Sequence, residues 1–142
     1  MKVTGTDGKE YIVEPGANLS GANLSGADLS DADLWRANLR DTNLSDTNLN
    51  DANLWRANLR GANLIRTNLS GANLWRANLR EANLRDTNLS DANLSDANLW
   101  RANLRGANLR DTNLSDANLS GAVWNGETVF PKGFEIPDEL QG

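Results

Sequence analysis

The sequence contains no cysteine and no histidine. The first absence excludes disulfides and thiolate chemistry, and together they close the usual routes to nucleophilic catalysis and zinc binding. No run of about 18 apolar residues occurs, so no segment is suited to cross a membrane. Residues 1–15 also lack the apolar core of a signal peptide. These absences predict a cytoplasmic chain that is not an enzyme, uses no cofactor and binds no membrane.

Aromatic residues make up only 6% of the chain, and the net charge of -5 is unevenly distributed. Residues 17–121 carry 11 arginines against 12 acidic residues, whereas the two flanks carry 3 lysines against 7 acidic residues. The central region is therefore nearly neutral between acidic ends. A near-neutral surface of this kind argues against nucleic acid as a partner.

What the sequence has in abundance is leucine, which recurs at every fifth position from Leu19 to Leu119. Alanine or threonine stands two positions before each leucine, and Asn or Asp stands directly before it. A helix would scatter these leucines around its axis, and an odd period breaks the alternation of a strand. The chain must instead turn a corner once in each five-residue unit, or pentad, with leucine and the small residue inside. The predicted core leucines include Leu19, Leu39, Leu59, Leu69, Leu79, Leu99 and Leu119.

These units resemble the pentapeptide repeat family over about three quarters of the chain. Examples are ANLSG at residues 22–26 and variants such as ANLRD. The resemblance implies an all-β fold, a right-handed quadrilateral β-solenoid of about five coils with four pentads in each coil. Some members of that family are structural or interaction proteins of cyanobacteria. Others imitate duplex DNA and bind type II topoisomerases such as gyrase.

Both flanks of the repeats are expected to cap the solenoid, because its end coils would otherwise expose apolar surface and strand edges. Residues 1–16 predict an N-terminal cap with a hairpin that turns near Asp7 and Gly8, and with Tyr11, Ile12 and Val13 over the first coil. Residues 17–126 form the solenoid. Residues 127–142 predict a hydrophobic C-terminal cap with a short helix over 137–141. This end is also a candidate homodimer surface, so the chain is expected to be a monomer or a C-terminal-end homodimer.

Four pentads per coil would place residues 20 apart directly above one another. The outward tryptophans and arginines then fall into three columns, which form a candidate interaction stripe: Trp35, Trp55 and Trp75; Arg36, Arg56 and Arg76; Arg40, Arg60 and Arg80. Such a stripe suits an anionic polymer, with arginine on phosphates and tryptophan on rings. It equally suits cation–π packing within the chain.

Two other patterns concern possible polar sites. Thr47, Thr67 and Thr87 occupy the inward position and predict a column of buried hydroxyls. Asp28, Asp31 and Asp33 form an acidic cluster, but their spacing matches no calcium loop. We therefore expect no metal site.

The 20-residue spacing breaks once. Tryptophan skips from 75 to 100, threonine from 87 to 112 and arginine from 80 to 105, each a step of 25. The chain thus carries one additional pentad, most simply residues 95–99. An additional pentad forms one complete extra side of the coil and keeps every inward residue in place. We therefore predict no bulge, and a surface pattern that is rotated by one face after this pentad. Trp100 should continue the column of Arg80, and Ser95 should lie over Trp75.

Together these patterns predict a non-catalytic structural or protein-interaction scaffold with an unidentified protein partner. Gyrase binding through DNA mimicry is an alternative, although it requires a more acidic rod. Binding of an anionic polymer by the Trp/Arg stripe is a second alternative. Residues 75–94 and 100–119 differ only at Glu81 and Gly106, a regularity that also permits an engineered consensus repeat.

Overall fold

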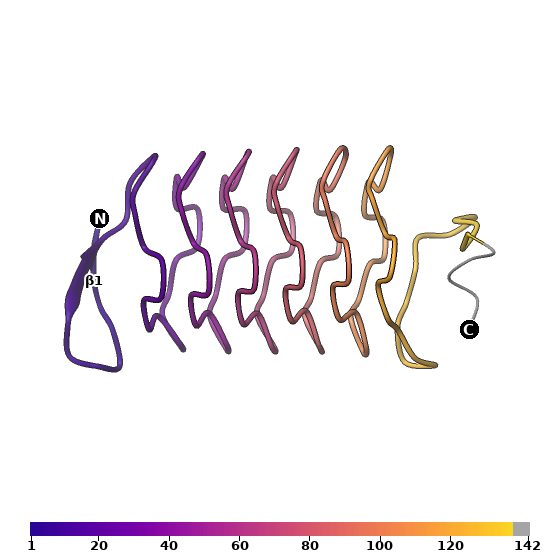
Figure 1. Cartoon of the computed structure of the whole chain (residues 1–142). Helices are drawn as coiled ribbons and strands as arrows, with labels where there is room; N and C mark the ends of the chain where they lie inside the picture. The colour runs from indigo at the N-terminus through magenta and orange to yellow at the C-terminus, as the bar shows by residue number, and fades with distance from the viewer. Residues whose placement is uncertain (138–142) are drawn as a thin grey trace.

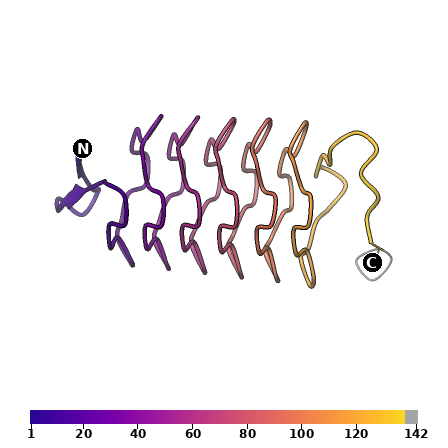
Figure 2. The same ribbon diagram turned by 90° about the horizontal axis from the view of Figure 1, so that it is seen from above.

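The chain winds into a stack of similar coils that follow one another in sequence order from end to end (Figure 1). The structure is a computed structural model and describes residues 1–137. The first and the last of the described residues lie at opposite ends of the stack, as the view from above also shows (Figure 2). The molecule is therefore a rod whose side surface is built from repeated corners.

Parallel bridges between residues 20 apart join each coil to the next. They begin at Asn18 with Asn38 and continue without a break to Asn103 with Val123. Each coil therefore takes four pentads, as the family resemblance implies. Each pentad contributes only one bridged residue per side, so the sides are too short to count as regular strands.

The corners follow from two features of each pentad. The residue before the inward Ala or Thr has a positive φ, even where it is not glycine, as at Arg56 with φ 55 and Asp91 with φ 61. The Asn before each leucine stabilises the next corner: the side-chain oxygen of Asn58 accepts a hydrogen bond from the backbone N–H of Arg60 at 3.1 Å. The five-residue period places this Asn only outside the core, whereas in the structure it forms part of the turn.

The core is a column of leucines lined by small residues. Leu24 through Leu109 are fully buried at every fifth position, and Leu19 and Leu119 in the end coils are 4% and 8% exposed. All seven leucines named above lie in this core, as predicted. The inward threonines are buried, and their hydroxyls donate to leucine carbonyls of the preceding coil, as Thr67 does to Leu44 at 2.6 Å. Each buried hydroxyl is thus satisfied.

The N-terminal end is a hairpin of strands β1 (Lys2–Thr4) and β2 (Glu10–Ile12), which pair antiparallel with Val3 opposite Tyr11. The turn lies at the predicted place, where Gly8 has φ 78 and its N–H donates to the carbonyl of Gly5. Val3, Tyr11 and Val13 pack on the core. The prediction for Ile12 is wrong. It is 54% exposed, because alternate strand residues face opposite sides.

At the C-terminal end the register of the repeats continues through Val123, so Trp124 stands in a leucine place. One residue is then inserted, because Val129 pairs with Asn108 at a spacing of 21. Thr128 still donates its hydroxyl to the carbonyl of Leu104 at 2.8 Å. Phe130 stacks on Phe134 with centroids 5.4 Å apart, and both pack with Trp124 against the core. Most of the helix predicted over 137–141 lies outside the described residues.

The additional pentad produces no bulge. The bridges from Asn73 to Asn93 and from Asn78 to Asn98 keep the 20-residue spacing through residues 95–99. The N–H of Glu81 donates to the carbonyl of Trp100 at 2.8 Å, and the N–H of Arg76 donates to that of Ser95 at 3.0 Å. The predicted rotation of the surface pattern by one corner is confirmed.

Candidate interaction surface

One corner of the rod carries the tryptophans. We call it the tryptophan corner and define it as residues 35 and 36 together with their successors at steps of 20, up to residues 115 and 116. Trp35 and Trp55 have ring centroids 5.5 Å apart at an interplanar angle of 40°. Trp55 and Trp75 are 5.6 Å apart and nearly parallel, at 3°. The spacing of the coils thus places the rings in a continuous stack, where each is half-buried by its neighbours.

The arginines that follow these tryptophans lie against the rings. The guanidinium carbon of Arg56 is 5.3 Å from the Trp55 centroid and 5.8 Å from that of Trp75, and Arg76 is 4.5 Å from Trp75. Attraction between a cation and the ring face offsets part of the repulsion between stacked arginines. The cation–π packing considered from the sequence is therefore present, and the arginine side chains remain exposed.

The second arginine column lies at the next corner along the chain. Arg40 and Arg60 are near acidic residues, at 3.4 Å from Asp41 and 3.5 Å from Glu81. Arg80 instead stacks on a ring, that of Trp100, with its guanidinium carbon 4.7 Å from the centroid. The structure thus brings all nine predicted stripe residues onto two adjacent corners. Whether this stripe binds a partner remains a prediction.

The tryptophan stack ends where the additional pentad begins. Ser95 follows Trp75 in the column, and the indole N–H of Trp75 donates to the carboxylate of Asp96 at 3.1 Å. The same carboxylate lies 3.9 Å from the guanidinium of Arg76. An open hollow of about 630 Å³ lies where the column changes from Trp75 to Ser95. It is lined by Asn53, Trp55, Asn73, Trp75, Asn93 and Ser95. Sequence reasoning missed Asp96, although its place above Arg76 follows from the 20-residue spacing.

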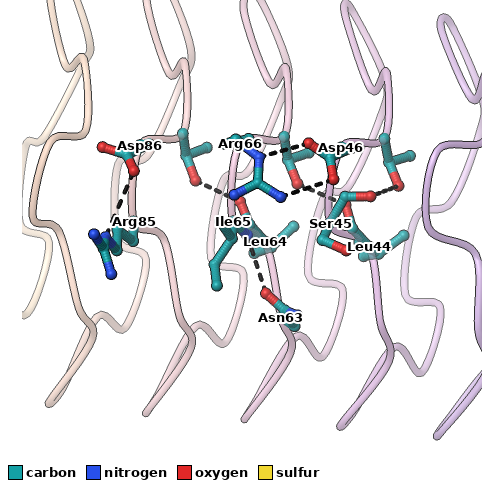
Figure 3. Close-up of polar contacts among 12 residues, drawn as sticks. Leu44, Ser45, Asp46, Asn63, Leu64, Ile65, Arg66, Arg85 and Asp86 are labelled. Atoms are coloured by element: carbon teal, nitrogen blue, oxygen red, sulfur yellow. Dashed lines mark hydrogen bonds and ion pairs between the residues drawn. The ribbon is translucent and has the colours of Figure 1, made fainter.

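Among residues 1–137, the shortest ion pair lies at a different corner (Figure 3). Arg66 donates from two nitrogens to the two carboxylate oxygens of Asp46 in the preceding coil, at 2.7 and 2.9 Å. These hydrogen bonds lower the pKa of Asp46 below its ordinary value and raise the pKa of Arg66. Nearby, Arg85 lies 3.5 Å from Asp86 in its own coil. Most charged side chains at this corner form ion pairs within the chain, so few of them are available to a partner.

The acidic cluster near residue 28 is used structurally. Asp28 accepts hydrogen bonds from the hydroxyl and N–H of Ser30 and from Asn48, and the hydroxyl of Ser30 contributes most to a lowered pKa of Asp28. Asp33 accepts from Asn53 at 3.1 Å. Over residues 1–137, no group of three or more acidic residues is placed to hold a metal ion. The same residues contain no helix long and apolar enough to cross a membrane.

Comparisons with known proteins agree with this geometry. A family model described as "Pentapeptide repeats" matches in eight copies, over residues 17–56, 47–86, 57–96 and 87–123. A solved pentapeptide repeat protein from the cyanobacterium Cyanothece 51142 is 36% identical, with a TM-score of 0.63, over 81% of this chain and 88% of that chain. Another, from Nostoc PCC 7120, is 46% identical, with a TM-score of 0.53, over 62% and 77%. No relative was found among curated protein sequences.

The coil geometry and the extent of the match define the class of protein: a right-handed β-helix built from five-residue units. The chain belongs to the pentapeptide repeat family. Proteins of this family are in general structural or interaction proteins, not enzymes.

Proposed function

We propose that the chain is a non-catalytic scaffold that presents the tryptophan corner and the adjacent Arg40, Arg60 and Arg80 column to a protein partner. The observation that carries this proposal is the concentration of half-buried tryptophan and of exposed or half-buried arginine on two adjacent corners. Tryptophan and arginine are the residue types that contribute most to binding at protein interfaces. The remaining corners carry mainly small side chains and acidic residues, interspersed with a few arginines.

The rigidity of the coils supports a scaffold. Consecutive coils are joined by backbone hydrogen bonds at sides and corners alike, as from Leu39 to Asn58 at 2.7 Å and from Asp41 to Arg60 at 2.9 Å. A side chain on such a coil loses little further backbone freedom when it binds. Preorganised side chains of this kind favour association.

We further propose that the ends act as caps, with residues 1–16 over the first of about five coils and residues 127–142 over the last. Packing of Val3 and Tyr11 at one end and of Trp124, Phe130 and Phe134 at the other supports this assignment. The C-terminal end stays a candidate homodimer surface, and a cytoplasmic location stays a prediction. The alternative of DNA mimicry gains no support from a corner that carries Arg36, Arg56 and Arg76.

Affinity capture from a lysate tests the interaction surface. The bait variant changes Trp35, Trp55 and Trp75 to serine. A matched control changes three side chains in one column of another corner, Ile65, Arg85 and Arg105, to serine. The proposal predicts a captured protein that the tryptophan variant loses and the control retains. Equal capture by both variants would show that binding uses another surface.

A further inference from the structure

The tryptophan corner changes its character halfway along the rod. In the N-terminal part, each tryptophan is followed by an arginine, as at Trp55 and Arg56. From the additional pentad onward, serine followed by aspartate occupies the same two places, at Ser95 with Asp96 and at Ser115 with Asp116. One corner therefore has a bulky, positively charged half and a small, negatively charged half.

We propose that two copies of this chain associate side by side and antiparallel through their tryptophan corners. This inference rests on the proposed function in that it uses the same interaction surface. An antiparallel pair with two-fold symmetry places each half of one corner against the other half of its copy. When one copy of the tryptophan corner is turned end to end, its positive, bulky half faces the negative, small half of the other copy. This complementarity favours a second copy of the chain over an unrelated partner.

Charge determines how the two rods align. When Arg76 lies opposite Asp96 of the second copy, Arg56 lies opposite Asp116, and symmetry repeats both pairs. Alignment of Arg76 with Arg76 of the second copy would instead oppose like charges, which disfavours that register. Among residues 1–137, neither Arg56 nor Asp116 takes part in an ion pair within its own chain. Both charges are thus free to pair across the interface.

Shape favours the same alignment. Trp75 comes to lie opposite Ser95 of the second copy, and Trp55 opposite Ser115, so each large side chain meets a small one. The hollow of about 630 Å³ beside Trp75 and Ser95 lies next to this contact and has room for an incoming ring. Close packing of large against small side chains is what a specific interface requires.

The adjacent corner contributes less to the register, because its Glu81 already lies 3.5 Å from Arg60 of its own chain. The contact still spans only four coil levels of the tryptophan corner, about 14 Å at ordinary strand spacing. An interface of this length falls below the standard size of stable complexes. Self-association is therefore weak, driven by charge and reduced by salt.

Sedimentation velocity over a range of concentrations tests the proposal. At low ionic strength the weight-average mass of the wild type should rise with concentration toward twice the monomer mass, and it should return to the monomer value in high salt. Arg56→Asp with Arg76→Asp, and separately Asp96→Arg with Asp116→Arg, should each stay monomeric. An equimolar mixture of these two double variants should recover the dimer. Corner positions already hold both Asp and Arg at positive φ, so these variants keep the backbone.

A matched control places the same charge change at a different corner, Asp91→Arg with Asp111→Arg. Mixed with the Arg56→Asp, Arg76→Asp variant, this control should form no heterodimer. Because the chain has no cysteine, orientation can be read from crosslinking. Oxidation of a mixture of Arg56→Cys and Asp116→Cys chains should give mainly the mixed disulfide, whereas a parallel pair would give the two symmetric products.

Several results would overturn the proposal: a wild type that stays monomeric at low salt, self-association that survives both double variants, or symmetric disulfides. A monomeric chain that still captures a protein through its tryptophans would reject self-association alone and leave the scaffold function standing. Loss of both self-association and tryptophan-dependent capture would reject the two proposals together.

Discussion

The guanidinium of Arg80 lies over the ring of Trp100 in the next coil, with its central carbon 4.7 Å from the ring centroid. Both residues belong to one column, although Trp35, Trp55 and Trp75 stand at the preceding corner. The contact is the direct consequence of the additional pentad. It also buries the Nε atom of Arg80, which has no hydrogen-bond partner among residues 1–137, and cation–π attraction compensates for this in part.

Leu69 reports on the packing of the coils. It is fully buried, and the hydrogen-bonded coils on either side cannot collapse into a cavity. We expect Leu69→Ala to lower the free energy of unfolding by about 2 to 5 kcal/mol in denaturant titrations. The exposed Ser115, whose hydroxyl has no hydrogen bond within the described residues, provides the control. Equal losses for Leu69→Ala and Ser115→Ala would contradict the assignment of inward and outward positions.

Glycine at the corners matters through its backbone conformation. Gly26 has φ 71, and a Cβ added there would meet no atom within 4 Å. The cost of replacing this glycine therefore comes from backbone strain in the left-handed region and not from a steric clash. Gly26→Ala should cost about 1 to 2 kcal/mol of unfolding free energy. Gly126 has equally open surroundings without a positive φ, and Gly126→Ala should cost nothing. A similar cost at the two sites, measured by thermal or chemical denaturation, would exclude this cause.

Asp46 makes stability depend on pH in a predictable direction. Hydrogen bonds from Arg66 lower its pKa in the folded state, so the charged carboxylate stabilises the fold above the ordinary pKa. This contribution disappears as the pH falls through the lowered pKa of the folded state. Melting temperatures of the wild type and of Asp46→Asn should therefore differ near neutral pH and converge in acid. A constant difference across the titration would show that the pair contributes no pH dependence.

Much of the fold could be predicted because the period of five admits few solutions. The leucine positions and the inward threonines such as Thr67 followed from counting residues. The rotation at Trp100 also required the four pentads per coil that the family resemblance implies. Other features could not be read from spacing. The exposure of Ile12 depends on which face of a three-residue strand meets the first coil. The bond from Trp75 to Asp96 depends on rotamers, and the corner role of Asn58 depends on local turn geometry that a period does not specify.

Removing one pentad would test how the surface pattern arises. Residues 90–94 and 95–99 are identical, so deletion of either gives a chain in which Trp100 follows Trp75 in the column and Arg101 follows Arg76. Every inward residue keeps its place, and we expect a cooperatively folded rod. A fourth ring should join the stack at a spacing close to the 5.6 Å between Trp55 and Trp75. Coupling among four stacked indoles should strengthen the aromatic circular dichroism of the protein.

The control for that deletion removes residues 115–119, which have the same sequence but follow Trp100. It shortens the rod equally and leaves Trp100 over Arg80, so the aromatic signal should match the wild type. The first deletion also leaves arginine along the whole tryptophan corner through residue 101, and a uniformly basic column has no complement in its own copy. Its self-association should therefore be lost as the aromatic signal grows. Identical spectra for the two deletions would mean that the extra side does not set the position of Trp100.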